Sequence, residues 1–285
     1  MSPGSASASA AVQLSVRNIH KSFTGKGAGV RVLDGLNFDI HEQDFVSIIG
    51  PSGCGKSTIF NIVAGLIEPD EGRLVYRGEE VASLRGRVGY MMQKDLLFPW
   101  RTVLGNVLLG LEMRGVSYRA AVERAREHLE AFGLGGFENA YPKTLSGGMR
   151  QRVALIRTLV MDPGILLLDE PFSALDYQTR LYLEGVLKQA VEKFHKTVVL
   201  VTHDIDEAVA LSKRVVVLSG RPARVKAVHD IEIAEHSPIA ARSDHRFAGY
   251  FRTLCNELDI QTETKSAAES ATRFAPAGPT EAVAS

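Results

Sequence analysis

The chain has 285 residues, a length that fits one large domain or two small ones. Lysine plus arginine and aspartate plus glutamate each number 33, so the formal charge is zero, which argues against a strongly basic nucleic-acid-binding protein. Hydrophobic residues make up 45% of the chain and charged residues 23%, which excludes a wholly disordered protein. The two cysteines, Cys54 and Cys255, form no CxxC pair, so we expect neither a disulfide scaffold nor a cysteine zinc site.

The sequence predicts no membrane-crossing segment. No run of apolar residues reaches the roughly 18 that a membrane-spanning helix needs. Residues 1–11 lack the basic region and apolar core of a secretory signal, and their serine and alanine content predicts a disordered leader. We therefore expect a cytoplasmic protein that cannot itself cross a membrane, although a partner could.

Along the first part of the chain, residues 12–49 alternate apolar and polar positions between glycine-rich turns. This pattern predicts antiparallel strands that lead into an apolar strand at Phe45–Ile49. A helix is predicted from Lys56 to about Leu66, and the EPDEG segment at residues 68–72 predicts a turn.

The second part of the chain alternates helical patterns with short apolar runs. Helices are predicted at residues 119–132, 147–161, 178–195, 204–212 and 240–258, and strands at residues 165–169, 197–202, 214–218 and 224–228. Such alternation favours an α/β fold in which helices cover both faces of a mostly parallel sheet.

The predicted helices between residues 94 and 160 interrupt this alternation and indicate an inserted helical subdomain. The rest of the fold is then a core made of residues 12–93 and 161–230, in which the antiparallel strands accompany the mostly parallel sheet. Residues 231–260 form a predicted C-terminal extension, and the polar residues 261–285 form a predicted disordered tail.

Residues 50–57, GPSGCGKS, fit the phosphate-binding pattern GxxxxGK[ST], between a predicted strand and a predicted helix. The glycines let backbone N–H groups curl around phosphate oxygens, and the start of the helix adds partial positive charge. We expect Lys56 to reach the β- and γ-phosphates and the Ser57 hydroxyl to bind Mg²⁺. The alternative is a glycine-rich turn that matches by chance. The predicted nucleotide-binding residues here are Gly50, Pro51, Ser52, Gly53, Cys54, Gly55, Lys56, Ser57 and Thr58.

Two acidic residues, Asp169 and Glu170, follow the apolar run Ile165–Leu168. They therefore stand at the carboxyl end of a predicted strand, where ligands bind in open α/β sheets. We expect Asp169 to bind Mg²⁺ and Glu170 to act as general base or water-orienting group. The alternative for each is a helix-capping or solvated carboxylate.

His203 follows the next predicted strand, so it too lies at a strand end. An imidazole there can donate a hydrogen bond to a γ-phosphate. The alternative is an ordinary surface or core histidine. Cys54, inside the phosphate loop, is either a buried, inert thiol or a site at which a thiol modifier would block ATP.

Taken together, these motifs and residues 145–149, LSGGM, resemble the nucleotide-binding ATPase subunits of ABC transporters along residues 12–220. The resemblance implies a P-loop NTPase core that binds ATP and Mg²⁺ and hydrolyses ATP. In that family LSGGM corresponds to the signature motif, through which Ser146, Gly147 and Gly148 contact the ATP held by a second subunit.

The same resemblance assigns the remaining site residues. Gln93 corresponds to the Q-loop, implied to be catalytic and to contact the metal, and Asp176 belongs to the D-loop at residues 173–176. His203 corresponds to the switch histidine and Phe23 to the aromatic residue that stacks on adenine. By default, Phe23 in a strand would belong to the core, and Ser146 with its glycines would cap a helix.

The sequence departs from the family pattern at two places. Met149 stands where the signature commonly has glutamine, and Phe23 stands where tyrosine is common. Since the family's phosphate contacts come mainly from the serine and the glycine backbone, Met149 leaves ATP binding plausible. Phe23 keeps the aromatic face and loses the hydroxyl.

A narrower resemblance, to the nitrate, sulfonate, taurine and thiamine-precursor importers, rests on the QKDLLFPWRTV run at residues 93–103 and the DIDEA run at 204–208. It implies a dimer with itself or a paralogous ATPase, integral membrane permease subunits, an indirect role for an extracytoplasmic solute-binding protein, and a place on the cytoplasmic face of the cell membrane. Leu96–Trp100 is the candidate segment to grip the permease, unless Phe98 and Trp100 belong to the helical core.

Three functions remain open at this stage. The first is the ATPase of an importer for a small anionic or sulfonate-type solute, and the second is the ATPase of an exporter or lipid-transport system. The third is an ABC-type ATPase acting on nucleic acid or ribosomes, which the single motif set and zero net charge disfavour.

Overall fold

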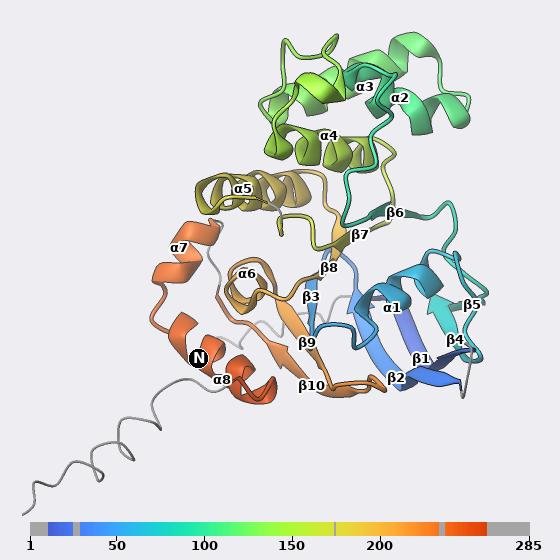
Figure 1. The fold of residues 1–285 in the computed structure, drawn as a ribbon, viewed down its shortest axis with the longest axis vertical. Helices are drawn as coiled ribbons and strands as arrows, with labels where there is room; N and C mark the ends of the chain where they lie inside the picture. Colours follow the sequence, from blue (N-terminus) through green and yellow to red (C-terminus); the bar gives the residue numbers. More distant parts are fainter. Residues whose placement is uncertain (1–10, 25–28, 174, 234–236, 261–285) are drawn as a thin grey trace, which may run out of the picture.

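The computed structural model describes residues 11–24, 29–173, 175–233 and 237–260. The predicted tail and nearly all of the predicted leader therefore lie outside the described residues, as does Ala174 of the D-loop. The described residues form two sheets and a set of helices (Figure 1).

The smaller sheet is antiparallel and comes from the amino-terminal part of the chain. Its strand order is β2-β1-β4-β5, with β1 at Val12–Phe23, β2 at Val30–His41, β4 at Glu71–Tyr76 and β5 at Glu79–Val81. The antiparallel strands predicted within residues 12–49 are present, but β4 and β5 were not predicted. β4 begins inside the segment predicted as a turn, where only Gly72, at φ 94°, has turn-like backbone geometry suited to glycine.

The larger sheet has the order β10-β9-β3-β8-β7-β6, and only the β10–β9 pair is antiparallel. Its strands are β3 at Phe45–Ile49, β6 at Val88–Met91, β7 at Ile165–Asp169, β8 at Thr197–Val201, β9 at Arg214–Leu218 and β10 at Val225–Asp230. Every residue of β3, β7 and β8 is buried, as expected for parallel strands covered on both faces. The predicted α/β class with a mostly parallel sheet is therefore confirmed.

The helices are α1 at Lys56–Val63, α2 at Val103–Met113, α3 at Tyr118–Ala131, the short η1 at Pro142–Thr144, α4 at Gly147–Leu159, α5 at Tyr177–Lys193, α6 at Ile205–Leu211, α7 at Pro238–Ser243 and α8 at Phe247–Glu257. Among the described residues, none of them is long and apolar enough to span a bilayer.

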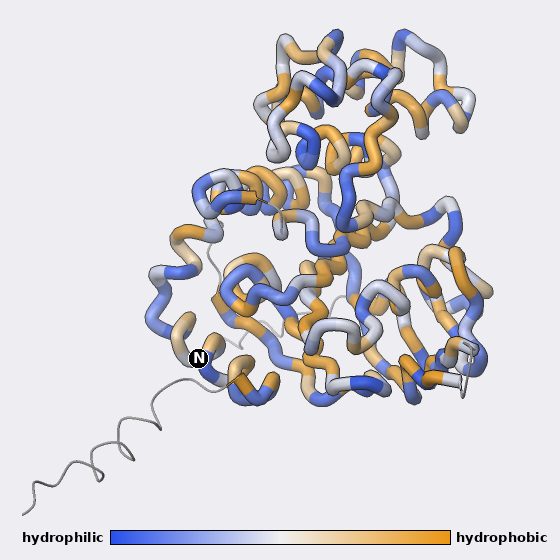
Figure 2. The backbone as a smooth tube through the Cα atoms, in the orientation of Figure 1, coloured by the Kyte–Doolittle hydropathy of each residue, from blue (hydrophilic) through white to orange (hydrophobic). Residues whose placement is uncertain are grey.

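Alternate residues of β7 pack against different helices. Ile165 and Leu167 belong to the hydrophobic cluster that contains α1 and the inner face of the small sheet. Leu166 and Leu168 belong to the cluster formed with α2, α3, α4 and α5. Because successive side chains of a strand point to opposite faces of the sheet, the same short strand contributes to two hydrophobic clusters. Figure 2 shows apolar residues concentrated along these central strands.

The last predicted helix is wrong in one respect, because residues 240–258 form two helices rather than one. α7 ends at Ser243, and the Asp244 carboxylate accepts hydrogen bonds from the backbone N–H of Arg246, at 2.8 Å, and from its guanidinium. An aspartate that bonds the backbone two residues on favours a turn over a continuous helix. α8 then packs with α6 and β9 in a third hydrophobic cluster.

Candidate functional site

The phosphate loop connects β3 to α1 at the carboxyl edge of the large sheet. Gly53 and Gly55 have φ values of 71° and 127°, which side-chain-bearing residues rarely adopt. A Cβ on Gly55 would lie 2.8 Å from side-chain carbons of both Val32 and Leu33, so this glycine also lets the loop approach β2. The Lys56 ammonium group is buried and donates hydrogen bonds to the Gly50 carbonyl oxygen at 2.8 Å and to Pro51 at 3.1 Å.

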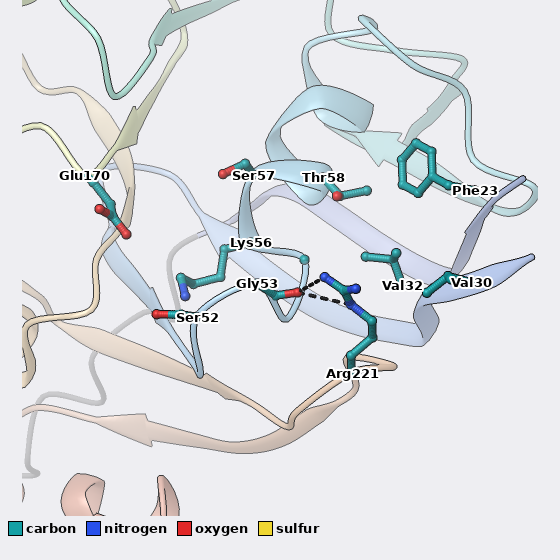
Figure 3. Close-up of a pocket in the computed structure, with 11 residues that line it drawn as sticks. Phe23, Val30, Val32, Ser52, Gly53, Lys56, Ser57, Thr58, Glu170 and Arg221 are labelled. Carbon is teal, nitrogen blue, oxygen red and sulfur yellow. Dashed lines mark hydrogen bonds between the residues drawn. The ribbon is translucent and has the colours of Figure 1, made fainter. Parts of the chain in front are cut away.

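A cavity of about 480 Å³ opens beside this loop. Figure 3 shows Phe23 at one end and Lys56 with Glu170 toward the other. Phe23 is 43% exposed, which is not the environment of a core phenylalanine. The lining residues are Phe23, Val30, Val32, Ser52, Gly53, Gly55, Lys56, Ser57, Thr58, Glu170 and Arg221.

The loop residues predicted to bind nucleotide therefore divide into two groups. Six of the nine line the cavity, whereas Gly50, Pro51 and Cys54 do not. Cys54 is 1% exposed and packs in the hydrophobic cluster that contains α1. Of the two alternatives for Cys54, a buried thiol or one open to a modifier, the structure has the buried thiol.

Asp169 ends β7 and is buried beside the first turn of α1. Ser57 forms a side-chain hydrogen bond with it, and the Tyr90 hydroxyl donates to its Oδ2 atom at 3.4 Å. Burial raises the pKa of Asp169, and the hydrogen bonds from Ser57 and Tyr90 oppose that shift. A hydroxyl and a carboxylate side by side are oxygen ligands of the kind that Mg²⁺ prefers, so Ser57 and Asp169 fit the metal site predicted for them.

Glu170 lies where three predicted site residues meet. Its backbone φ is 48°, a left-handed conformation that is uncommon outside glycine and clusters at functional sites. Gln93 Nε2 donates to Glu170 Oε2 at 3.0 Å, and His203 Nδ1 lies 3.3 Å from Glu170 Oε1. The structure thus gathers Gln93, Glu170 and His203, although Gln93 contacts Glu170 here rather than the Ser57–Asp169 pair.

The signature residues lie apart from this cavity. Ser146 is the N-cap of α4, and its Oγ atom accepts a hydrogen bond from the Met149 N–H at 3.3 Å. Ser146 and Gly147 are exposed, and none of Ser146, Gly147 and Gly148 lines the cavity. Met149 packs against the helical core, so an apolar residue is well accommodated at this position.

Asp176 of the D-loop is the N-cap of α5 and accepts a hydrogen bond from the Thr179 N–H at 3.0 Å. This backbone hydrogen bond lowers the pKa of Asp176, so the side chain is anionic at neutral pH. Asp176 therefore caps a helix in this structure and does not line the cavity.

In the Leu96–Trp100 segment, hydrogen bonds hold the backbone at Leu96 and Phe98, while the Trp100 side chain is exposed. Buried Asn106 accepts from the Phe98 N–H at 2.7 Å and donates to the Phe98 carbonyl at 3.1 Å, while Arg157 donates to the Leu96 carbonyl at 2.9 Å. Trp100 is 70% exposed, with its ring centroid 5.1 Å from that of Phe98. Trp100 is therefore not part of the helical core.

Several residues of the site were not predicted: Val30 and Val32 of β2, which line the cavity, and two polar residues, Tyr90 and Arg221. Tyr90, on β6, links Asp169 to the Asn61 side chain of α1, at 3.3 Å. Arg221 follows β9, the neighbour of β3, and reaches the cavity beside Gly53. Neither polar residue lies in a sequence motif, and only the pairing of β6 with β7 and of β9 with β3 brings them to the loop.

Comparison with known proteins is consistent with this architecture. The ABC transporter family model matches residues 33–173. The chain is 48% identical over 247 residues to an uncharacterized ABC transporter ATP-binding protein of Methanocaldococcus jannaschii, covering 87% of this chain and 91% of that protein. It is 43% identical over 215 residues to the aliphatic sulfonates import ATP-binding protein SsuB of Bacillus cereus, covering 75% of this chain and 84% of SsuB.

Among solved structures, the chain resembles the dimeric structure of MJ0796, a bacterial ABC transporter cassette, with a TM-score of 0.69 and 33% sequence identity. The match covers 77% of this chain and 99% of MJ0796. The fold, the phosphate loop with its acidic strand end, and these relatives together assign the family. The chain belongs to the ATP-binding, ATP-hydrolysing subunits of ABC transporters.

Proposed function

We propose that the chain powers an ABC importer for a small anionic or sulfonate-type solute, such as nitrate, an aliphatic sulfonate or taurine, by ATP-driven closure of a dimer. One observation carries the proposal: the phosphate loop and Glu170 line one cavity and His203 lies against Glu170, while Ser146 is exposed and does not line that cavity. A second copy, or a paralogous ATPase, that brought its own Ser146, Gly147 and Gly148 to this cavity would complete the site.

In the proposed reaction, adenine stacks on Phe23 and the triphosphate lies along the loop toward Lys56. The Lys56 ammonium exchanges its bonds to loop carbonyls for bonds to the β- and γ-phosphates, which are stronger because both partners are charged. Ser57 and Asp169, together with Gln93, would hold Mg²⁺, which would neutralise phosphate charge.

Glu170 then accepts a proton from the attacking water while the water oxygen forms a bond to the γ-phosphorus. The bond from that phosphorus to the bridging oxygen breaks, and ADP and phosphate form. His203, 3.3 Å from Glu170, donates a hydrogen bond to the γ-phosphate. Loss of the γ-phosphate removes charge that holds the two copies together, which makes hydrolysis the switch between closed and open dimers.

We further propose that residues 12–93 and 161–230 form the nucleotide-binding core, residues 94–160 a helical subdomain and residues 231–260 a C-terminal extension. In this division the helical subdomain carries both Ser146 and the Leu96–Trp100 segment. Because Arg157 of α4 bonds the Leu96 carbonyl, a shift of α4 toward a partner's ATP would also move that segment.

The proposed partner of the Leu96–Trp100 segment is an integral membrane permease. This places the chain peripherally on the cytoplasmic face of the cell membrane, with a solute-binding protein acting on it only indirectly. The hydrogen-bonded backbone of this segment and the 70% exposed Trp100 ring support this, because aromatic anchors dominate many protein interfaces. The importer assignment and the solute class are supported by the similarity to SsuB proteins, whose name states aliphatic sulfonate import.

Affinity purification of the tagged chain from membranes tests the partner. We expect a polytopic permease to copurify, and we expect Trp100→Ala to lose it while Tyr118→Ala, which removes an equally exposed aromatic ring from α3, retains it. Recovery of DNA or ribosomes instead would contradict the proposal. In proteoliposomes with that permease, ATP-driven uptake of an aliphatic sulfonate, nitrate or taurine would identify the solute, and outward transport would overturn the importer assignment.

A further inference from the structure

Arg221 lines the nucleotide cavity, yet the reaction described above gives it no role. Its Nε atom donates to the Gly53 carbonyl oxygen at 3.2 Å, and Nη2 donates to the same oxygen. Figure 3 shows the guanidinium group between Gly53 and Val32, where it reaches the phosphate loop from the segment after β9.

The segment that carries Arg221 is attached to the wall of the cavity. Ala223 is fully buried; its N–H donates to the Val32 carbonyl at 2.8 Å, and its carbonyl accepts from the Asp34 N–H at 3.0 Å. Ser219 Oγ accepts from the Arg224 N–H at 2.9 Å and closes the turn. The backbone just after Arg221 is thus held against β2, the strand that presents Val30 and Val32 to the cavity, and the backbone before it is tied to Arg224 within the turn.

The charge of Arg221 is not balanced by a protein carboxylate. Within the described residues, its guanidinium makes no ion pair, whereas Arg224, three positions later, pairs with the buried Asp34. An arginine side chain has five N–H donors. The Gly53 carbonyl uses the Nε donor and one Nη2 donor, so three donors and a full positive charge remain at the wall of a cavity meant for an anion.

The place of Arg221 along the cavity indicates which part of the nucleotide it meets. Lys56 and Glu170 mark the end for the terminal phosphates, and Phe23 marks the adenine end. Arg221 lies between them, beside Val32. We propose that Arg221 is a nucleotide-binding residue, which holds Gly53 with two N–H groups and donates its remaining ones to the ribose and α-phosphate.

Binding measurements can distinguish this role from a purely structural one. ATP and ADP share the ribose and α-phosphate, so loss of the Arg221 side chain should weaken the binding of both nucleotides by the same factor. A hydrogen bond to a charged group contributes enough that we expect about a 10-fold higher Kd for each. Turnover at saturating ATP stays within about twofold, because the contact is the same before and during the reaction.

The test compares Arg221→Gln with Arg31→Gln in the full chain by calorimetric titration with ATP and ADP. Arg31 lies between Val30 and Val32 on β2, so it faces away from the cavity, where it pairs with Asp34. We expect Arg221→Gln to raise both Kd values about 10-fold and the KM for ATP in parallel, and Arg31→Gln to change neither. The nucleotide-free Tm of Arg221→Gln should differ little from that of the parent chain, because the two bonds to Gly53 that it loses are exposed to solvent.

Unchanged affinities in Arg221→Gln would overturn the proposal, as would a loss for ATP without a loss for ADP. Reduced affinity together with a lower nucleotide-free Tm, or a lower kcat with unchanged KM, would assign Arg221 a structural role and also overturn it. The inference rests on the proposed nucleotide site and not on the proposed transport function. ATP binding by the parent chain and its loss in Lys56→Ala show independently whether that site stands.

Discussion

The nucleotide cavity and the signature region are built in opposite ways. Around the cavity, polar side chains contact one another or the loop: Ser57 bonds Asp169, Gln93 bonds Glu170, and Lys56 bonds its own loop. At the signature, the Ser146 side chain bonds only the start of its own helix, and its glycine neighbours add no side chain.

This difference concerns preorganisation. Contacts within one chain fix the cavity, so a single copy is expected to bind ATP. The Ser146 region presents an exposed helix N-terminus, whose backbone N–H groups suit an anion, and Ser146, Gly147 and Gly148 do not line the nucleotide cavity of their own chain. If the proposed dimer forms, binding belongs to one copy and hydrolysis needs both.

The largest effect is expected from Lys56→Ala, which should abolish both ATP binding and hydrolysis. The substitution removes the buried ammonium that closes the loop and the charge meant for the β- and γ-phosphates. Calorimetric titration of ATP measures the loss, and circular dichroism checks that the variant is folded. Unchanged ATP affinity in a folded variant would remove Lys56 from the site.

Ser146→Arg should abolish hydrolysis while leaving ATP binding by the monomer intact. A long charged side chain at an exposed N-cap would block a partner's approach without reaching the cavity of its own chain. Titration of ATP and steady-state turnover, measured on the same preparation, separate the two steps. Loss of ATP affinity in the monomer would contradict the division between the two regions.

Glu170→Gln should keep ATP binding and slow hydrolysis by about 10²–10⁴-fold, the usual contribution of a general base. The amide retains the size of the carboxylate and cannot take the proton. Single-turnover assays measure the rate, and size-exclusion chromatography with ATP should show the trapped dimer. Turnover at the parent rate would contradict the base role.

A buried carboxyl group that does not line the cavity, Glu207 in the first turn of α6, accepts a hydrogen bond from the Thr202 hydroxyl. Burial raises its pKa to about 8 from 4.5, so the folded protein binds a proton there that the unfolded chain releases. Stability from this group is full below pH 4.5 and falls by about 1.4 kcal/mol per pH unit as the pH rises toward 8. Glu207→Gln should flatten that part of a urea-denaturation profile; an unaltered slope would show that this carboxyl group is not enclosed.

The smallest effect is expected from Ser146→Ala. Loss of the side-chain cap should destabilise α4 by about 1 kcal/mol, since the Met149 N–H loses its partner. Thermal unfolding measures this loss. Because the backbone N–H groups of Gly147 and Gly148 remain, hydrolysis should fall far less than in Ser146→Arg. Complete loss of hydrolysis would show that the hydroxyl itself, and not the open helix end, is what the second copy needs.

Several elements of the fold followed from local pattern, and others did not. The runs at Phe45–Ile49 and Ile165–Leu168 predicted buried strands because both of their faces are apolar. β6 has only four residues, too few for a period to show in the sequence, so it became visible only through its pairing with β7. The break between α7 and α8 depends on the hydrogen bonds of Asp244, which helical periodicity does not reveal.

The candidate site divides in the same way. Lys56, Asp169, Glu170 and His203 could be predicted because each occupies the end of a recognisable strand or the start of a helix, where backbone geometry exposes it to a ligand. Their mutual contacts could not, because they depend on the strand order β3-β8-β7, in which β3 pairs with a strand about 150 residues later in the chain and β7 lies on the other side of that strand.

By itself, the sequence determined the phosphate loop, the acidic strand end and the α/β class, since these depend on spacing and periodicity within short segments. Only the tertiary structure decided that Arg221 and Tyr90 reach the site, that Phe23 and Trp100 are exposed and that Cys54 is buried. The physical reason is that burial and contact between distant segments depend on strand order and helix packing, which no single segment encodes.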